Sequence, residues 1–113
     1  MSGRTIDEAV FAELQVSAGA EFVGELVETF LEEAPAMLAA LRAAAATGDA
    51  ASFRRAAHSL KSNANTFGAS ALGALARDLE LGGIPAAGDD GPLAALASEY
   101  ARAAARLREL RGG

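Results

Sequence analysis

The segment FRRAAHSLKSNANTFGASALGALARDL, residues 53–79, carries the clearest structural pattern of the chain. Its first half has apolar side chains at intervals of three or four residues, the repeat of one face of an α-helix. Gly68 follows, and leucines with the same spacing return after Ser70. The segment therefore predicts two amphipathic helices, with Gly68 ending the first and Ser70 capping the second. The inward positions are Phe53, Ala57, Leu60, Ala64 and Phe67 on the first helix, and Leu72, Leu75 and Leu79 on the second.

Two further helices are predicted before this segment. Thr5 and Glu8 have the spacing of a capping box, which predicts a short helix that ends near Val16. A longer helix then runs from residue 19 to residue 47. Its apolar stripe keeps its phase across Pro35, so we expect one kinked helix instead of two. The stripe consists of Val23, Val27, Phe30, Ala34, Met37, Leu41 and Ala44.

Turn-forming residues separate the helices. Gly48 suits the end of the long helix, and Asp49 suits the N-cap of the next one. Residues 82–90, GGIPAAGDD, form the longest predicted loop, after which Asp90 caps a last helix with Pro92 in its first turn. The inward stripe of this helix is Leu93, Leu96, Tyr100, Ala103, Leu107 and Leu110, its outward residues are Glu99, Arg102, Arg106 and Glu109, and residues 111–113 are expected to fray.

The composition also indicates an all-α chain. Strong helix formers dominate, with 30 Ala and 14 Leu against 4 Val and 2 Ile among 113 residues. That length suits a single domain. Amphipathic helices joined by short loops predict an antiparallel up-down four-helix bundle that spans residues 1–113, with the short N-terminal helix as a lid. The many alanines imply close helix packing and a thin core, with no ligand cavity.

Charge and composition exclude several functional classes. With 10 basic and 15 acidic residues the net charge is −5, a poor basis for binding nucleic acid. Without cysteine there is no disulfide framework, zinc ribbon or thiol nucleophile, and one histidine is too few for a two-histidine metal site. The longest charge-free segment, residues 62–76, is rich in Ser, Asn, Thr and Gly, and the N-terminus lacks the apolar core of a signal peptide. We therefore expect a cytoplasmic protein without a membrane span.

The histidine lies off the apolar stripe of its helix. His58 is therefore expected to face solvent, and nearby cations disfavour its imidazolium form and keep the ring neutral and nucleophilic near pH 7. The same cations would stabilise an attached phosphoryl group. Spacing alone leaves two interpretations open, a covalent nucleophile and an ordinary surface histidine. Its helical neighbours are Arg54, Arg55, Lys61, Ser62 and Asn65.

The run HSLKSNANTFGA, residues 58–69, resembles the histidine-containing phosphotransfer (HPt) domain. That family has a pattern of roughly His-x-Leu-Lys-Gly-Ser-Ala-x-x-Leu/Phe-Gly-Ala, followed by leucines and a Leu-Glu pair, here Leu79 and Glu80. The preceding FLEEAPAMLAALRAAAATGD, residues 30–49, is also similar to the family, so the likeness covers about residues 7–110. It implies a phosphorelay module of two-component signalling. Such a module takes a phosphoryl group from a receiver aspartyl phosphate or a histidine kinase and passes it to another receiver.

The resemblance also assigns roles by position. His58 would be the phosphoacceptor, Lys61 its basic neighbour, and Gly68 the tight turn between two helices. Glu80 falls where the family has an acidic or amide residue that hydrogen-bonds the other ring nitrogen. Whether Glu80 does so, or is an ordinary exposed helix acid, the sequence leaves open.

The expected partner-docking residues surround the histidine on the solvent side. The family usually has glycine four residues after the histidine, where this chain has Ser62, and Asn63 replaces a more usual Ser or Thr. A serine is small enough to admit a receiver, and its hydroxyl could bind phosphoryl oxygens. It could also narrow the range of partners. The docking residues are Arg54, Arg55, Ser59, Ser62 and Asn65.

The sequence favours a phosphocarrier over an enzyme. It has no Gly-rich phosphate loop between a strand and a helix, so no ATP site is expected. The resemblance implies receiver domains and a sensor or hybrid histidine kinase as partners of a monomer, with Mg²⁺ on the receiver. The main alternative is a non-phosphorylated helical adaptor that binds receivers. A kinase dimerisation domain needs an acidic residue directly after its histidine, where this chain has Ser59. A general-base hydrolase is a further alternative, for which the helices suggest no Ser-His-Asp arrangement.

Overall fold

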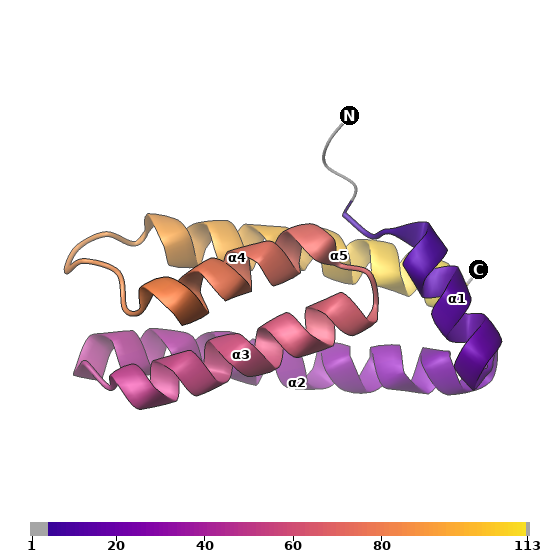
Figure 1. Cartoon of the computed structure of the whole chain (residues 1–113), viewed down its shortest axis with the longest axis horizontal. Coiled ribbons are helices and arrows are strands. Elements are labelled where there is room, and N and C mark those ends of the chain that lie inside the picture. Colours follow the sequence, from indigo (N-terminus) through magenta and orange to yellow (C-terminus); the bar gives the residue numbers. More distant parts are fainter. Residues whose placement is uncertain (1–4, 113) are drawn as a thin grey trace.

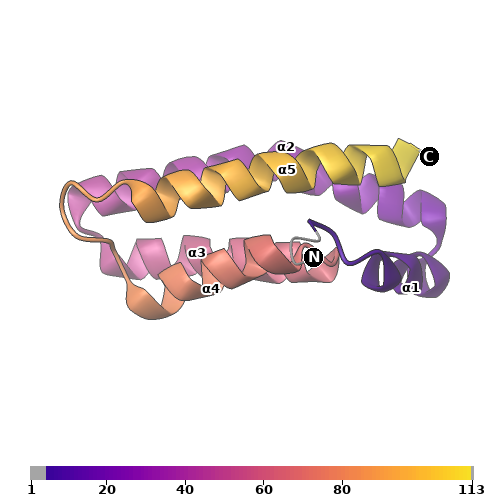
Figure 2. The same ribbon diagram turned by 90° about the horizontal axis from the view of Figure 1, so that it is seen from above.

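Residues 5–112, which the computed structural model describes, form five helices and no strand. Helices α2 to α5 run up and down beside one another as an antiparallel bundle, and α1 lies across the end where α2 begins (Figure 1). Seen from above, α2 and α5 make one layer and α3 and α4 the other (Figure 2). The predicted all-α bundle is thus confirmed. The helices are α1 (Glu8–Ala18), α2 (Ala20–Thr47), α3 (Ala50–Thr66), α4 (Ser70–Gly82) and α5 (Gly91–Gly112).

The apolar stripes read from the sequence form the core. On α2 and α3 every predicted inward residue is buried except Met37, which is half-buried at the edge of the core. Three aromatic rings contact one another, since the ring centroids of Phe30 and Phe67 are 5.5 Å apart in a tilted pair and those of Phe30 and Tyr100 are 6.1 Å apart in an edge-on pair. These rings join α2, the end of α3 and α5 into one apolar cluster.

Helix α2 passes through Pro35 without a break, as its stripe predicts. A proline has no N–H, so the carbonyl of Leu31, four residues earlier, loses its helical donor. The hydroxyl of Tyr100 on α5 donates a hydrogen bond to that carbonyl at 3.4 Å. The neighbouring helix therefore supplies the polar partner that the proline removes.

Of the four predicted N-caps, Asp49 is correct, Asp90 has the predicted position without a side-chain cap, and Thr5 and Ser70 are wrong. Asp49 accepts from the backbone N–H of Ser52 at 3.1 Å, as predicted. Helix α1 begins at Glu8, so its cap is Asp7, whose carboxylate accepts from the N–H groups of the next turn, and the predicted cap Thr5 lies too far upstream. Ser70 is the first residue of α4, and the helix has no side-chain cap.

Asp90 directly precedes α5 as predicted, and its carbonyl accepts from the N–H of Ala94 at 2.9 Å, but its side chain does not cap the helix. Its carboxylate forms an ion pair with Arg42 of α2 at 2.6 Å, and Asp89 accepts from the N–H of Gly91 instead. A long-range cation thus competes successfully with the local helix terminus for this carboxylate. At the same end of the bundle, the loop before α5 and the end of α2 enclose a shallow hollow of about 280 Å³.

Two predictions about the surface of α5 are also wrong. Glu99 was expected to point outward, but only 7% of its surface is exposed, and Arg102 holds its carboxylate at 2.7 Å. Arg111 was expected to fray, but it lies within α5 and pairs with Glu28 of α2 at 3.0 Å. Both outcomes depend on how neighbouring helices pack against α5, and the apolar periodicity of a single helix does not show that packing. Gly113, also expected to fray, lies outside the described residues.

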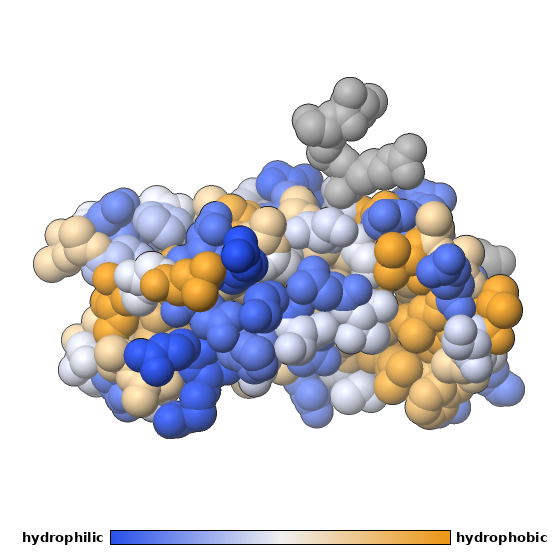
Figure 3. Space-filling model, in the orientation of Figure 1, coloured by the Kyte–Doolittle hydropathy of each residue, from blue (hydrophilic) through white to orange (hydrophobic). Residues whose placement is uncertain are grey.

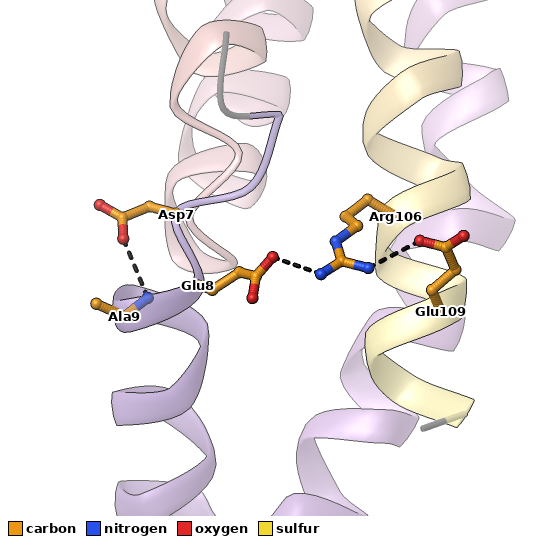
Figure 4. Close-up of polar contacts among 5 residues, drawn as sticks. All are labelled: Asp7, Glu8, Ala9, Arg106 and Glu109. Carbon is orange, nitrogen blue, oxygen red and sulfur yellow. Dashed lines mark hydrogen bonds and ion pairs between the residues drawn. The ribbon is translucent and has the colours of Figure 1, made fainter. Parts of the chain in front are cut away.

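The start of α1 is fixed to the rest of the bundle at several points. The N–H of Asp7 donates to the carbonyl of Gly68 at 2.7 Å, and Phe11 is buried in the core. Glu8 forms an ion pair with Arg106 of α5, which also contacts Glu109 (Figure 4). These two carboxylates raise the pKa of the Arg106 guanidinium, and Glu8 has the larger effect.

None of the helices within residues 5–112 has the length and apolar character that a membrane span requires.

Candidate functional site

Helices α3 and α4 pack against each other in a register that two contacts define. Asn65 of α3 lies over Gly73 of α4, where an added Cβ would be only 2.2 Å from the Asn65 Oδ1. About two helical turns away, His58 of α3 faces Glu80 of α4. Because the helices are antiparallel, higher residue numbers on α3 lie opposite lower residue numbers on α4. The sequence analysis did not identify Gly73, because its role depends on this pairing.

His58 stands at the rim of the groove between these helices, off the apolar stripe as predicted. Its side chain is 57% exposed, and its Nδ1 lies 2.8 Å from the Oε2 of Glu80. When the carboxylate is ionised, it can only accept this hydrogen bond, so Nδ1 carries the proton. The lone pair of the neutral ring is then on Nε2. The arrangement leaves Nε2 as the nitrogen available for reaction.

Glu80 also contacts Lys61, so one carboxylate joins the two residues. The Lys61 Nζ lies 2.8 Å from the Oε1 of Glu80, and the carboxylate side chain is only 16% exposed. The ion pair with Lys61, followed by the hydrogen bond from His58, lowers the pKa of the Glu80 carboxyl. Glu80 is therefore ionised at neutral pH and oriented from both sides. The sequence left open whether Glu80 hydrogen-bonds the ring of His58 or is an ordinary exposed helix acid. The geometry favours the first interpretation.

The predicted docking residues all lie on the exposed surface around His58. Hydrophilic side chains cover the middle of this face over α3 and α4, and apolar surface gathers toward α1 (Figure 3). Arg55 is turned toward the start of α3, where its Nη2 donates to the hydroxyl of Ser52 at 3.0 Å. Arg54, Ser59, Ser62 and Asn65 are likewise exposed. The structure thus brings His58, Lys61 and Glu80 into direct contact and places the docking residues around them.

The predicted turn between these helices is also present. Gly68 has a φ of +80°, a left-handed conformation that favours glycine, and an added Cβ would lie 2.7 Å from the carbonyl oxygen of Asp7. Gly68 therefore satisfies both the turn and the close approach of the segment before α1.

Among residues 5–112, no three His, Cys, Asp or Glu side chains lie together as a metal site would require.

Comparison with known proteins places this arrangement in a family. The Hpt domain family model matches residues 25–110, a range that includes the three residues in contact. Among solved structures, histidine-containing phosphotransfer protein B (HptB) from Pseudomonas aeruginosa PAO1 is similar, with a TM-score of 0.83 and 27% sequence identity over 98% of this chain and 97% of that chain. No curated protein matches the chain. The chain therefore belongs to the Hpt domain family, the phosphotransfer proteins of two-component signalling.

Proposed function

We propose that this chain is a phosphorelay intermediate that accepts a phosphoryl group on Nε2 of His58 and passes it to a receiver domain. The observation that carries the proposal is the 2.8 Å contact between the Nδ1 of His58 and Glu80 on a half-exposed ring. A ring held through Nδ1 presents the Nε2 lone pair outward. A neutral imidazole nitrogen is an established covalent nucleophile.

The transfer follows from this geometry. The Nε2 lone pair forms the N–P bond while the P–O bond of a receiver aspartyl phosphate breaks, and the aspartate carboxylate leaves with the electron pair. Positive charge develops on the ring and is shared with Glu80 through the Nδ1–H. Delivery to the carboxylate of a second receiver reverses the same steps. A histidine kinase is the other donor that we propose.

The remaining roles belong to the same proposal. Lys61 fixes Glu80, and we assign docking of the receiver to the exposed surface of α3. We place the Mg²⁺ that assists phosphoryl transfer on the receiver, and we propose that the chain acts in the cytoplasm as a monomeric carrier without an ATP site. The docking residues are Arg54, Arg55, Ser59, Ser62 and Asn65.

Mapping the labelled residue tests the proposal. The wild-type chain and His58→Gln are incubated with candidate kinases, phosphorylated receivers and phosphoramidate, and circular dichroism checks that both are folded. We expect acid-labile, base-stable phosphate on His58 and none on the variant. Label that persists in His58→Gln, or its absence from wild type with every donor, would overturn the proposal. Binding of receivers without label would instead favour the adaptor.

A further inference from the structure

Two of the cationic side chains near His58 already have partners. The ammonium of Lys61 is held by Glu80 at 2.8 Å, and the guanidinium of Arg55 by Ser52 at 3.0 Å. Two exposed arginines near the site, Arg54 on α3 and Arg77 on α4, form no ion pair or side-chain hydrogen bond with any residue in the range 5–112, and Arg54 is already assigned to receiver docking. The sequence analysis did not single out Arg77, because it lies 19 positions after the histidine along the chain.

The register of α3 and α4 places Arg77 beside the site. The Asn65–Gly73 and His58–Glu80 contacts mark two levels of the groove between these helices. Arg77 comes four residues after Gly73 and three before Glu80, so it lies between these levels on the same side of α4. Residues at such spacing are neighbours on a helix surface, about 5–6 Å apart at Cβ. Arg77 therefore stands on the rim of α4, facing the rim of α3 that carries His58.

A phosphoryl group on His58 would be stabilised by a cation whose charge is not already shared with Glu80. It brings close to two negative charges and three acceptor oxygens. The charge of Lys61 is already shared with the Glu80 carboxylate, which also accepts from the ring. An arginine presents a planar fork of N–H donors that matches phosphate oxygens. We infer that the guanidinium of Arg77 binds the phosphoryl oxygens of phosphorylated His58.

This inference rests on the proposed function and makes it more specific. Lys61 and Glu80 act on the ring before transfer, whereas Arg77 acts on the phosphoryl group. Its loss should therefore lower the stability of the phosphorylated form and leave the unphosphorylated site unchanged. Arg77 and His58 belong to different helices, so the phosphoryl group would join α3 to α4 through them.

The experiment compares Arg77→Gln and Arg77→Lys with wild type and with Arg108→Ala. Arg108 is a matched control, because it is exposed on α5 and also forms no ion pair within residues 5–112. Each protein is charged with phosphoramidate, so no receiver is needed. The hydrolysis half-life of the phosphohistidine and its ³¹P chemical shift are then measured at low and high salt.

We expect Arg77→Gln to shorten the half-life by about two- to fivefold at low salt, the effect of an exposed charge pair, and to move the ³¹P resonance. Arg77→Lys should retain part of the half-life, and Arg108→Ala should match wild type. If wild type is not labelled on His58, the proposed function fails. If wild type is labelled and Arg77→Gln behaves as Arg108→Ala does in both measurements, only the assignment of Arg77 is overturned.

Discussion

Glu80 determines which nitrogen of His58 is free to react. Its Oε2 accepts from Nδ1 at 2.8 Å, so truncation to alanine removes the partner that fixes the ring and its tautomer. We expect Glu80→Ala to slow phosphorylation about tenfold, the lower end of the range for carboxylates that orient functional histidines in metal sites. Glu80→Gln should keep most activity, since its amide oxygen also accepts. The ¹⁵N shifts of the ring should show a mixture of tautomers in Glu80→Ala alone, and unchanged shifts would contradict this role.

Lys61 acts through the same carboxylate. Its contact with Glu80 is the largest cause of the lowered pKa of that carboxyl, so Lys61→Ala should return the pKa toward its usual value. As the pH falls, Glu80 in the variant should become protonated at a higher pH than in wild type. The acid limb of the pH–rate profile for phosphorylation should therefore move to higher pH. Transfer should also slow, with little change in helicity. An acid limb at the same pH as in wild type would count against the coupling of Lys61 to Glu80.

At the scale of the element, α3 has one face for docking and one for packing. Ser62 is exposed and one turn from His58, so Ser62→Tyr should block a receiver while changing stability by no more than about 0.5 kcal/mol. Ser62→Gly should keep or improve transfer. Phe67 is 3% exposed and its ring contacts that of Phe30, so Phe67→Ala should cost about 3–5 kcal/mol. Thermal melts measure the effect of each variant on packing, and a transfer assay measures its effect on docking. Normal transfer by Ser62→Tyr would show that the docking face is wrongly assigned.

Local patterns predicted the helices well, because the repeat of a buried stripe is a property of each helix alone. Gly48 and Asp49 were also correct, since that turn is completed within a few residues. The predictions for the side chains of Glu99 and Asp90 failed because their positions depend on a tertiary partner or on packing. A sequence pattern does not show which helix will lie opposite such a residue.

At the scale of the whole molecule, the turn at Gly68 connects α1 to the bundle. Gly68→Ala would combine a strained left-handed backbone with a Cβ 2.7 Å from the carbonyl oxygen of Asp7. Gly88 is a matched control, because its φ of +86° is similar and an added Cβ meets nothing within 4 Å. We expect Gly88→Ala to cost roughly 1 kcal/mol and Gly68→Ala distinctly more, with faster amide exchange in α1. Equal melting temperatures for the two variants would contradict this account.

The site shows the same division between local and tertiary information. His58 and Lys61 are one turn apart on one helix, so their proximity follows from the sequence. Glu80 was placed beside them only through the family resemblance, and the structure adds its contacts with both residues. Gly73 and Arg77 were missed, since their importance arises from the register of α3 against α4.

The hydrogen bond between Tyr100 and the carbonyl of Leu31 has a practical consequence for spectroscopy. The chain has one tyrosine and no tryptophan, so its near-ultraviolet absorbance and fluorescence come almost entirely from this partly buried phenol. Burial raises the pKa of Tyr100 above 10.0, which means that the folded state binds its proton more tightly than the unfolded state does. This contribution to stability is complete below pH 10 and is lost as the pH rises through the higher folded value. The signal of Tyr100 therefore reports on the contact between α2 and α5 without an added label. It can be recorded during a phosphorylation assay at His58 as an independent signal.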